Sequence, residues 1–251
     1  MIGPGSTRTL DESLVAIKVW DLPVRLFHWA LVLLLIVQVV TGQIGGGLMS
    51  WHLYSGYCVL VLMIFRILWG FAGGTHARFA SFLASPAATL RFAKRLFSRE
   101  AVPQVGHNPL GGWMVILMIV SLTLQAASGL FANDGAAAEG PLAAKVSLED
   151  SNFLSEFHRW NLKLLLLLAG VHIAAVIFHW VVKKDNLVGA MFTGVKRVPE
   201  AAVHERREGL RDTPPRRAAS REAASAYFAS SWRALILLAV AVALVYMLVR
   251  H

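Results

Sequence analysis

The sequence predicts an all-α integral membrane protein in which four transmembrane helices form a bundle and one more transmembrane helix follows at the C-terminal end. Of the 251 residues, 56% are hydrophobic, and the mean hydropathy is +0.57. The apolar residues are concentrated in blocks long enough to cross a bilayer as helices, which is not typical of a soluble protein. Histidines recur inside these blocks, where ionisable groups are costly and tend to be functional.

Five apolar blocks carry this prediction, and we expect membrane helices at residues 23–41, 51–71, 110–131, 157–182 and 232–249. Asp21 and Pro23 favour a helix start at the first block, as an N-cap and a first-turn residue. The predicted organisation is a cytoplasmic N-terminal segment (1–22), a four-helix core (23–198), a basic cytoplasmic linker (199–231) and the fifth helix with a short outer tail (232–251). The sequence shows no convincing internal repeat.

The charges between the apolar blocks predict the orientation. Residues 72–111 contain five Lys or Arg and one acid, and residues 183–233 contain eleven Lys or Arg and six acids, whereas residues 131–156 contain five acids and one Lys. Because basic segments remain in the cytoplasm, we expect a multi-pass protein of the bacterial inner membrane with a cytoplasmic N-terminus and a periplasmic C-terminus. The net charge of +9 is then explained by topology and by contact with anionic lipid, without nucleic acid as a partner.

The fourth block carries His158, His172 and His179. The 14-residue step from His158 to His172 closes four helical turns to within about 40° and rises about 21 Å. Both imidazoles therefore leave one face of the helix, one near each side of the membrane. Because two neutral imidazoles fill the axial positions of a haem iron, this helix is predicted to supply one ligand to each of two haems.

Depth in the membrane favours His28 and His52 as the opposite ligands. The first block runs outward and the second inward, so His28 lies near the inner surface with His172, and His52 near the outer surface with His158. A four-helix bundle can hold cofactors between facing helices in this way. A shared zinc-type ion is disfavoured, because ligands about 21 Å apart on one helix cannot bind the same ion. For any single histidine, a hydrogen bond to a neighbouring helix is the alternative.

Spacing alone does not decide between His172 and His179. His179 lies seven residues beyond His172 on nearly the same stripe, and its depth also resembles that of His28. Small residues at Gly56, Gly170 and Ala174 would let a flat macrocycle approach the backbone. A role beside the haem, rather than on the iron, is the expectation for His179.

Three segments, VWDLPVRLFHW, HLYSGYCVLVLMIFRILWGF and EFHRWN…AGVHIAAVIFHWVVKKDNLVGAMFTG, resemble the bacterial cytochrome b561 family, which is itself similar to the b-type cytochrome subunits of nickel–iron hydrogenases. The resemblance covers residues 17–198. It implies two b-type haems, one ligated by His28 and His172 and the other by His52 and His158, and it favours His172 over His179. The linker and the fifth helix depart from the short members of the family.

Several other residues are candidates for a role near the haems. Four basic residues, Arg25, Arg66, Arg159 and Lys163, are expected beside haem propionates, because carboxylates favour cationic partners, with anchoring at the membrane interface as the alternative. His107, in the segment GHNPLGGW, is a candidate proton donor or acceptor for a quinone, with helix capping or a plain loop as the alternative. Gln125 and Ser128 are predicted to hydrogen-bond between helices.

The expected function is a di-haem b-type cytochrome that carries electrons across the membrane between quinone or quinol and a redox partner. A periplasmic c-type cytochrome fits that role, because the acidic segment 132–156 would attract a basic protein. The alternative is a haem-bearing anchor subunit of a larger dehydrogenase or hydrogenase, which the linker and fifth helix favour. A haem-free scaffold or transporter is the third possibility, and whether the chain itself catalyses quinone chemistry is left open.

Overall fold

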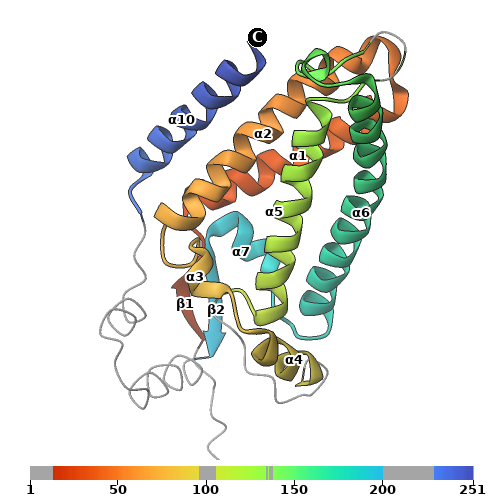
Figure 1. The fold of residues 1–251 in the computed structure, drawn as a ribbon. Coiled ribbons are helices and arrows are strands. Elements are labelled where there is room, and N and C mark those ends of the chain that lie inside the picture. The colour runs from red at the N-terminus through yellow and green to blue at the C-terminus, as the bar shows by residue number, and fades with distance from the viewer. Residues whose placement is uncertain (1–13, 96–105, 134, 136–137, 200–228, 251) are drawn as a thin grey trace, which may run out of the picture.

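The computed structural model describes residues 14–95, 106–133, 135, 138–199 and 229–250. Within them, five helices are long and apolar enough to cross a membrane (Figure 1): α1 (Leu22–Ile44), α2 (Met49–Ala72), α5 (Pro109–Gly129), α6 (Leu148–Val181) and α10 (Ser231–Val249). The five predicted spans are confirmed as helices that are long and apolar enough to cross a membrane. Their bounds fall within three residues of the prediction at every end except the start of α6.

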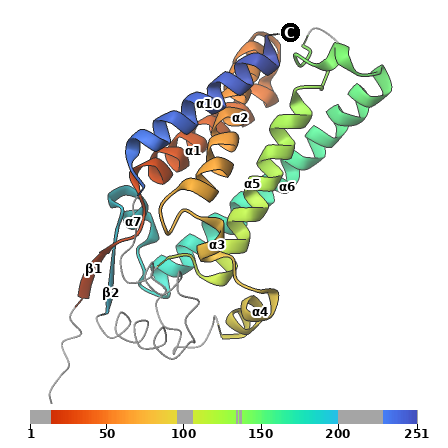
Figure 2. The ribbon, with the colours of Figure 1, turned by 60° about the vertical axis from the view of Figure 1, so that its left-hand side comes forward.

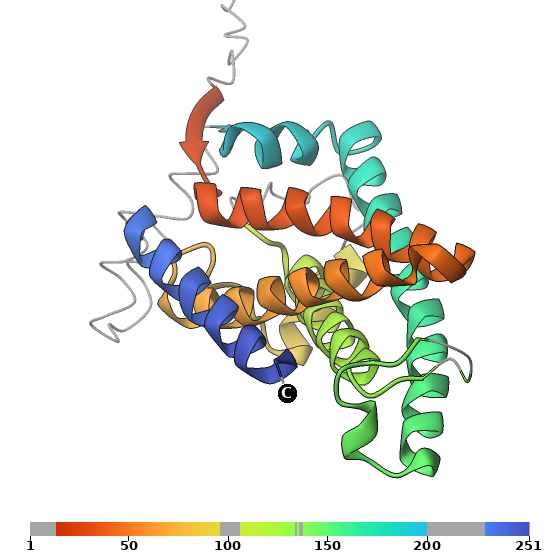
Figure 3. The ribbon, with the colours of Figure 1, turned by 90° about the horizontal axis from the view of Figure 1, so that it is seen from above.

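The five helices are organised around α2. α1 packs along α2, α5 packs along α6, and α2 joins these two helical hairpins by packing against α5. α10 lies beside α2 (Figures 2 and 3), where it buries Ala241 and Val245. Because α2 is central, its residues Met63 and Trp69 are completely buried. α6 lies at the edge of the bundle and packs mainly against α5. Its many exposed apolar side chains fit contact with lipid.

A two-stranded sheet lies at one end of the bundle, which the all-α prediction did not include. β1 (Leu14–Lys18) pairs antiparallel with β2 (Val195–Pro199), which follows α7 (Leu187–Thr193). Between α7 and β2, Gly194 has φ +80°, and a Cβ there would lie 2.8 Å from the carbonyl oxygen of Trp20. Glycine is therefore required for both conformation and space. The sheet joins the start of α1 to the end of the four-helix core.

We call the end of the bundle with β1 and β2 the sheet end. The opposite end, where α1 connects to α2 and α5 to α6, is the hairpin end. The connections at both ends contain short helices that were not predicted from the sequence. These are α3 (Phe79–Phe82) and α4 (Pro86–Arg95) toward the sheet end, and the 3-10 helices η1 (Gly46–Leu48) and η2 (Ala143–Lys145) at the hairpin end.

α6 begins nine residues before the predicted start at residue 157. Ser147 caps it by accepting a hydrogen bond from the Asp150 backbone N–H at 3.1 Å. Glu149 and Asp150 lie in the first turn, where negative charge stabilises a helix N-terminus. The end of the acidic segment, predicted as loop, is therefore helical. Asp134 of that segment and residues 200–228 of the predicted linker lie outside the described residues.

Asp21 starts α1 as the sequence predicted. Its carboxylate accepts a hydrogen bond from the Val24 backbone N–H at 2.9 Å, and Pro23 occupies the first turn. The same buried carboxylate accepts a hydrogen bond from Trp69 Nε1 at 3.2 Å. Asp21 therefore joins the start of α1 to the end of α2.

Candidate functional site

The four histidines paired by depth lie in two facing pairs. At the hairpin end, the ring centroids of His52 and His158 are 6.2 Å apart, with their planes at 76°. At the sheet end, those of His28 and His172 are 6.5 Å apart, with their planes at 54°. Two imidazoles that bind one metal from opposite sides, each through a nitrogen about 2 Å from it, have ring centres about 6 Å apart. Both separations fit the axial ligands of one iron.

The two pairs are separated by an apolar layer. It consists of Leu31, Val59, Met63, Leu122 and Leu165. Leu165 lies on α6 midway between His158 and His172 in sequence. Within the described residues, no group of three His, Cys, Asp or Glu side chains is arranged to hold a metal ion. The arrangement is therefore two separate two-histidine sites, one near each end of the bundle.

The histidines at the hairpin end have a defined hydrogen-bonding pattern. His52 Nδ1 lies 3.1 Å from the carbonyl oxygen of Gln38, and His158 Nδ1 lies 2.9 Å from that of Gln125. Because a carbonyl can only accept, these partners assign the hydrogen to Nδ1 in both rings. Each Nε2 then retains the lone pair that an iron ligand requires.

The sheet end differs, because unpartnered polar atoms gather there. In the part of the chain that the structure describes, the buried side-chain nitrogens without a hydrogen-bond partner belong to Arg25, His28, Trp29, Arg66 and His107. They lie toward the sheet end of α1 and α2 or just before α5. The arginine and tryptophan nitrogens of this set are donors, and buried donors normally have acceptors. The two carboxylates of a haem are acceptors that guanidinium groups favour, so this donor set fits a haem.

The basic residues predicted beside propionates lie in different settings. Arg25 Nη1 donates a hydrogen bond to the carbonyl oxygen of Phe192 on α7, while its buried Nε is unpartnered. Arg159 follows His158 on α6 and is exposed. The propionate roles remain predictions, and among the predicted cations Arg66 is buried with an unpartnered Nη1.

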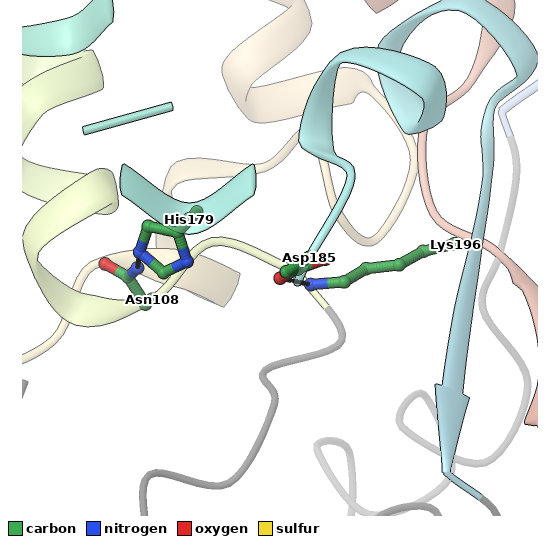
Figure 4. Close-up of polar contacts among 4 residues, drawn as sticks. All are labelled: Asn108, His179, Asp185 and Lys196. Atoms are coloured by element: carbon green, nitrogen blue, oxygen red, sulfur yellow. Dashed lines mark hydrogen bonds and ion pairs between the residues drawn. The ribbon is translucent and has the colours of Figure 1, made fainter. Parts of the chain in front are cut away.

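His172 is the histidine of α6 whose ring faces His28. His179 lies two turns further along, with Nε2 3.4 Å from Asn108 Nδ2 (Figure 4). Figure 4 also shows the ion pair between Lys196 of β2 and Asp185, 2.7 Å long, in the turn after α6. His179 therefore lies at the N-terminal end of α5, beside Asn108, which caps that helix.

His107 is packed between the rings of Trp20 and Phe82, at centroid distances of 4.6 and 4.8 Å. Burial, followed by the nearby charges of Arg66, His76 and His172, lowers the pKa of His107 to about 3. A neutral ring with so low a pKa is a poor proton acceptor near neutral pH. The neighbouring Asn108 caps α5, accepting a hydrogen bond from the Gly111 N–H at 2.7 Å, as the capping alternative for this segment anticipated.

The low pKa of His107 predicts a pH-dependent stability. Below its ordinary pKa of 6.5 the unfolded chain binds a proton at His107, whereas the folded protein does not until about pH 3. This stability contribution is present above pH 6.5 and decreases as the pH falls toward 3. Between pH 6.5 and 5 we expect the parent to lose up to about 2 kcal/mol more than His107→Leu. Thermal unfolding in detergent at both pH values measures the difference, and equal losses would contradict the prediction.

Two polar residues of the site were predicted and two were missed. Gln125 and Ser128 hydrogen-bond between helices as expected, since Gln125 Nε2 donates to the carbonyl oxygen of His158 at 3.0 Å and Ser128 Oγ lies 3.2 Å from its Nδ1. Gln38 and Thr41 make the corresponding contacts to His52. The signal that would have identified them is the shared pattern of QVVTG at 38–42 and QAASG at 125–129.

Comparison with known proteins identifies related membrane cytochromes. A family model described as prokaryotic cytochrome b561 matches residues 19–194. A "Probable Ni/Fe-hydrogenase B-type cytochrome subunit" of Rhodobacter capsulatus is 24% identical over 213 residues, which are 71% of this chain and 80% of the relative. Proteins with the same name from Cupriavidus necator (24% over 218 residues; 74% and 88%) and Azotobacter chroococcum (23% over 225 residues; 76% and 92%) are similarly related.

No solved structure matches the chain. The family match spans more than two thirds of the sequence, from the segment before α1 to the glycine after α7, and includes all four facing histidines. A family of b-type cytochromes implies haem b as the cofactor. The chain is thus a multi-pass membrane protein that belongs to the prokaryotic cytochrome b561 family.

Proposed function

We propose that the chain is the haem-bearing membrane subunit of a larger redox enzyme, and that it carries electrons between a catalytic partner subunit and a quinone in the bilayer. The observation that supports this most strongly is the presence of two facing histidine pairs, with ring centroids 6.2 and 6.5 Å apart, at opposite ends of the bundle. Haem b bound at each pair would supply reversible one-electron chemistry at its iron.

The chain's own residues would hold, orient and shield these groups. His52 and His158 would hold one haem and His28 and His172 the other, and two imidazole ligands on each iron would suit electron transfer. The apolar layer around Leu165 separates the two sites. At the sheet end, the unpartnered donors of Arg25 and Arg66 would bind carboxylates.

A subunit role is better supported than an independent electron carrier. The relatives are named as cytochrome subunits of nickel–iron hydrogenases, so a hydrogenase-like or other dehydrogenase partner is the one we propose. An independent carrier between quinol and a c-type cytochrome is the second candidate. It is favoured by the acidic first turns of α6, where Glu149, Asp150 and Glu156 are exposed. From the loop charges we infer that the sheet end lies on the cytoplasmic side of the bacterial inner membrane.

Purification in mild detergent tests this proposal. We expect two haems per chain, an α-band in the reduced-minus-oxidised spectrum, co-elution with a catalytic subunit, and oxidation of the reduced haems by a soluble quinone analogue. A preparation without an α-band would refute the cytochrome assignment. A protein that elutes alone and oxidises quinol would retain the haems but support the independent carrier.

A further inference from the structure

The pattern Gln-x-x-Thr/Ser-Gly occurs twice, at Gln38–Gly42 and at Gln125–Gly129. Each copy lies in the last turns of a helix, α1 or α5, that precedes a helix carrying a hairpin-end histidine. The connections differ greatly in length, because His52 follows Gln38 by 14 residues and His158 follows Gln125 by 33. The two copies nevertheless contact the same positions of their histidine-bearing helices, so their similarity does not arise from local sequence spacing.

The hydroxyl of each copy faces the ring of its histidine. Thr41 Oγ1 lies 3.3 Å from His52 Nδ1, and Ser128 Oγ lies 3.2 Å from His158 Nδ1. Each hydroxyl hydrogen is already donated to a carbonyl of its own helix, at 2.6 Å for Thr41 and 3.0 Å for Ser128. The hydroxyl oxygen can therefore accept from Nδ1–H together with the glutamine carbonyl. Both acceptors favour the tautomer with a free Nε2.

The glutamine side chains fix the depth of the two histidine-bearing helices. Gln38 Nε2 donates to the carbonyl oxygen of His52 and to Ser55 Oγ, both at 2.7 Å. Gln125 Nε2 donates to the carbonyl oxygen of His158, and its Oε1 accepts from Asn161 Nδ2 at 2.7 Å. Ser55 and Asn161 each lie three residues after the histidine. The two networks therefore involve the same two positions, the carbonyl of the histidine and the side chain three residues after it, although Gln38 donates to that side chain and Gln125 accepts from it.

The glycine of each copy lies against the imidazole ring. A Cβ on Gly42 would lie 2.9 Å from His52 Cε1 and 3.1 Å from Nδ1, and a Cβ on Gly129 would lie 3.0 and 3.3 Å from the same atoms of His158. Neither glycine has positive φ, so space for the ring, and not backbone conformation, explains the residue. An added methyl group would displace the ring from its carbonyl partner.

The sheet-end pair lacks this arrangement. His28 Nδ1 is buried without a hydrogen-bond partner. On α1, the residue ten positions before Gln38 is His28. On α5, the residue ten positions before Gln125 is Val115, so no histidine occupies the corresponding position. The duplication therefore applies to one end of the bundle only.

We propose that Gln38–Gly42 and Gln125–Gly129 are duplicate histidine-positioning sites, which hold both axial ligands of the hairpin-end haem in one tautomer and at one depth. This inference rests on the proposed function, because it requires a haem between His52 and His158. Hydrogen bonding from Nδ1–H makes each imidazole a stronger donor to iron. The positioning sites therefore stabilise the oxidised form of this haem and lower its reduction potential.

Redox titration of the purified holoprotein, with low-temperature electron paramagnetic resonance (EPR) of the oxidised haems, tests the proposal. Thr41→Val and Ser128→Ala remove an acceptor, while Gly42→Ala and Gly129→Ala displace a ring. Each change should shift one of the two haem potentials positively and alter the EPR signal of that same haem. Thr41→Ser and Ser128→Thr, which keep the hydroxyl, should restore the parent values.

Thr123→Val is the matched control, because among the described residues the hydroxyl of Thr123 bonds to the Ile119 carbonyl of its own helix, at 2.7 Å, and to no histidine. Unchanged potentials in the hydroxyl variants, equal shifts of both haems, or the same shift in Thr123→Val would overturn the inference. If the glycine variants do not fold, the hydroxyl variants decide the outcome. A parent protein without haem would instead refute the proposed function.

Discussion

Alanine at His52 and alanine at His158 are expected to remove the same haem, and alanine at His28 or His172 is expected to remove the other. Each variant should fall from two haems per chain to one, because an iron with one axial imidazole loses half of its protein ligation. The pairing follows from the facing rings at 6.2 and 6.5 Å. Haem quantification together with redox titration identifies which component disappears.

His179→Ala is the matched control for these substitutions. It removes an imidazole from the same helix, but one whose ring lies beside Asn108 and not opposite His28. It should retain both haems. If His172→Ala kept both haems and His179→Ala lost one, the assignment at the sheet end would be wrong.

Asp21→Ala is expected to lower the stability of the fold by roughly 3–5 kcal/mol. The change removes the cap of α1 at Val24 and the acceptor for Trp69 Nε1. It also removes a negative charge that interacts with buried Arg66. Burial raises the pKa of Asp21, while these hydrogen bonds and the charge of Arg66 oppose the rise. The midpoint of thermal unfolding in detergent measures the loss.

Two further variants separate the contributions at Asp21. Asp21→Asn keeps an acceptor for Val24 but loses the charge, so its stability should exceed that of Asp21→Ala by about 1 kcal/mol, the usual value of a cap. Asn108→Ala removes the uncharged cap of α5 and should also cost about 1 kcal/mol. Equal stability of Asp21→Ala and Asn108→Ala would show that the contacts with Trp69 and Arg66 contribute nothing.

The five membrane helices were predictable because their signal is local. A run of apolar residues of sufficient length is helical in a bilayer whatever lies beside it. A capping residue such as Asp21 can be recognised from the sequence because it bonds a backbone N–H only three residues later. The strands at Leu14–Lys18 and Val195–Pro199 were not predictable in this way, because each is stabilised only by a partner far away in the sequence. The early start of α6 had a local signal in Ser147 and Asp150, but their acidic surroundings resembled a loop.

The sequence by itself determined which histidines lie at which depth, because helical rise converts residue number into position across the membrane. Spacing did not decide between His172 and His179 as the ligand, because residues two helical turns apart point in nearly the same direction. Only the tertiary structure decided which ring faces His28, and only it brought the hydroxyls of Thr41 and Ser128 to the rings of His52 and His158. Those contacts join different helices, so their distances depend on how the helices pack, which no spacing along one chain segment specifies.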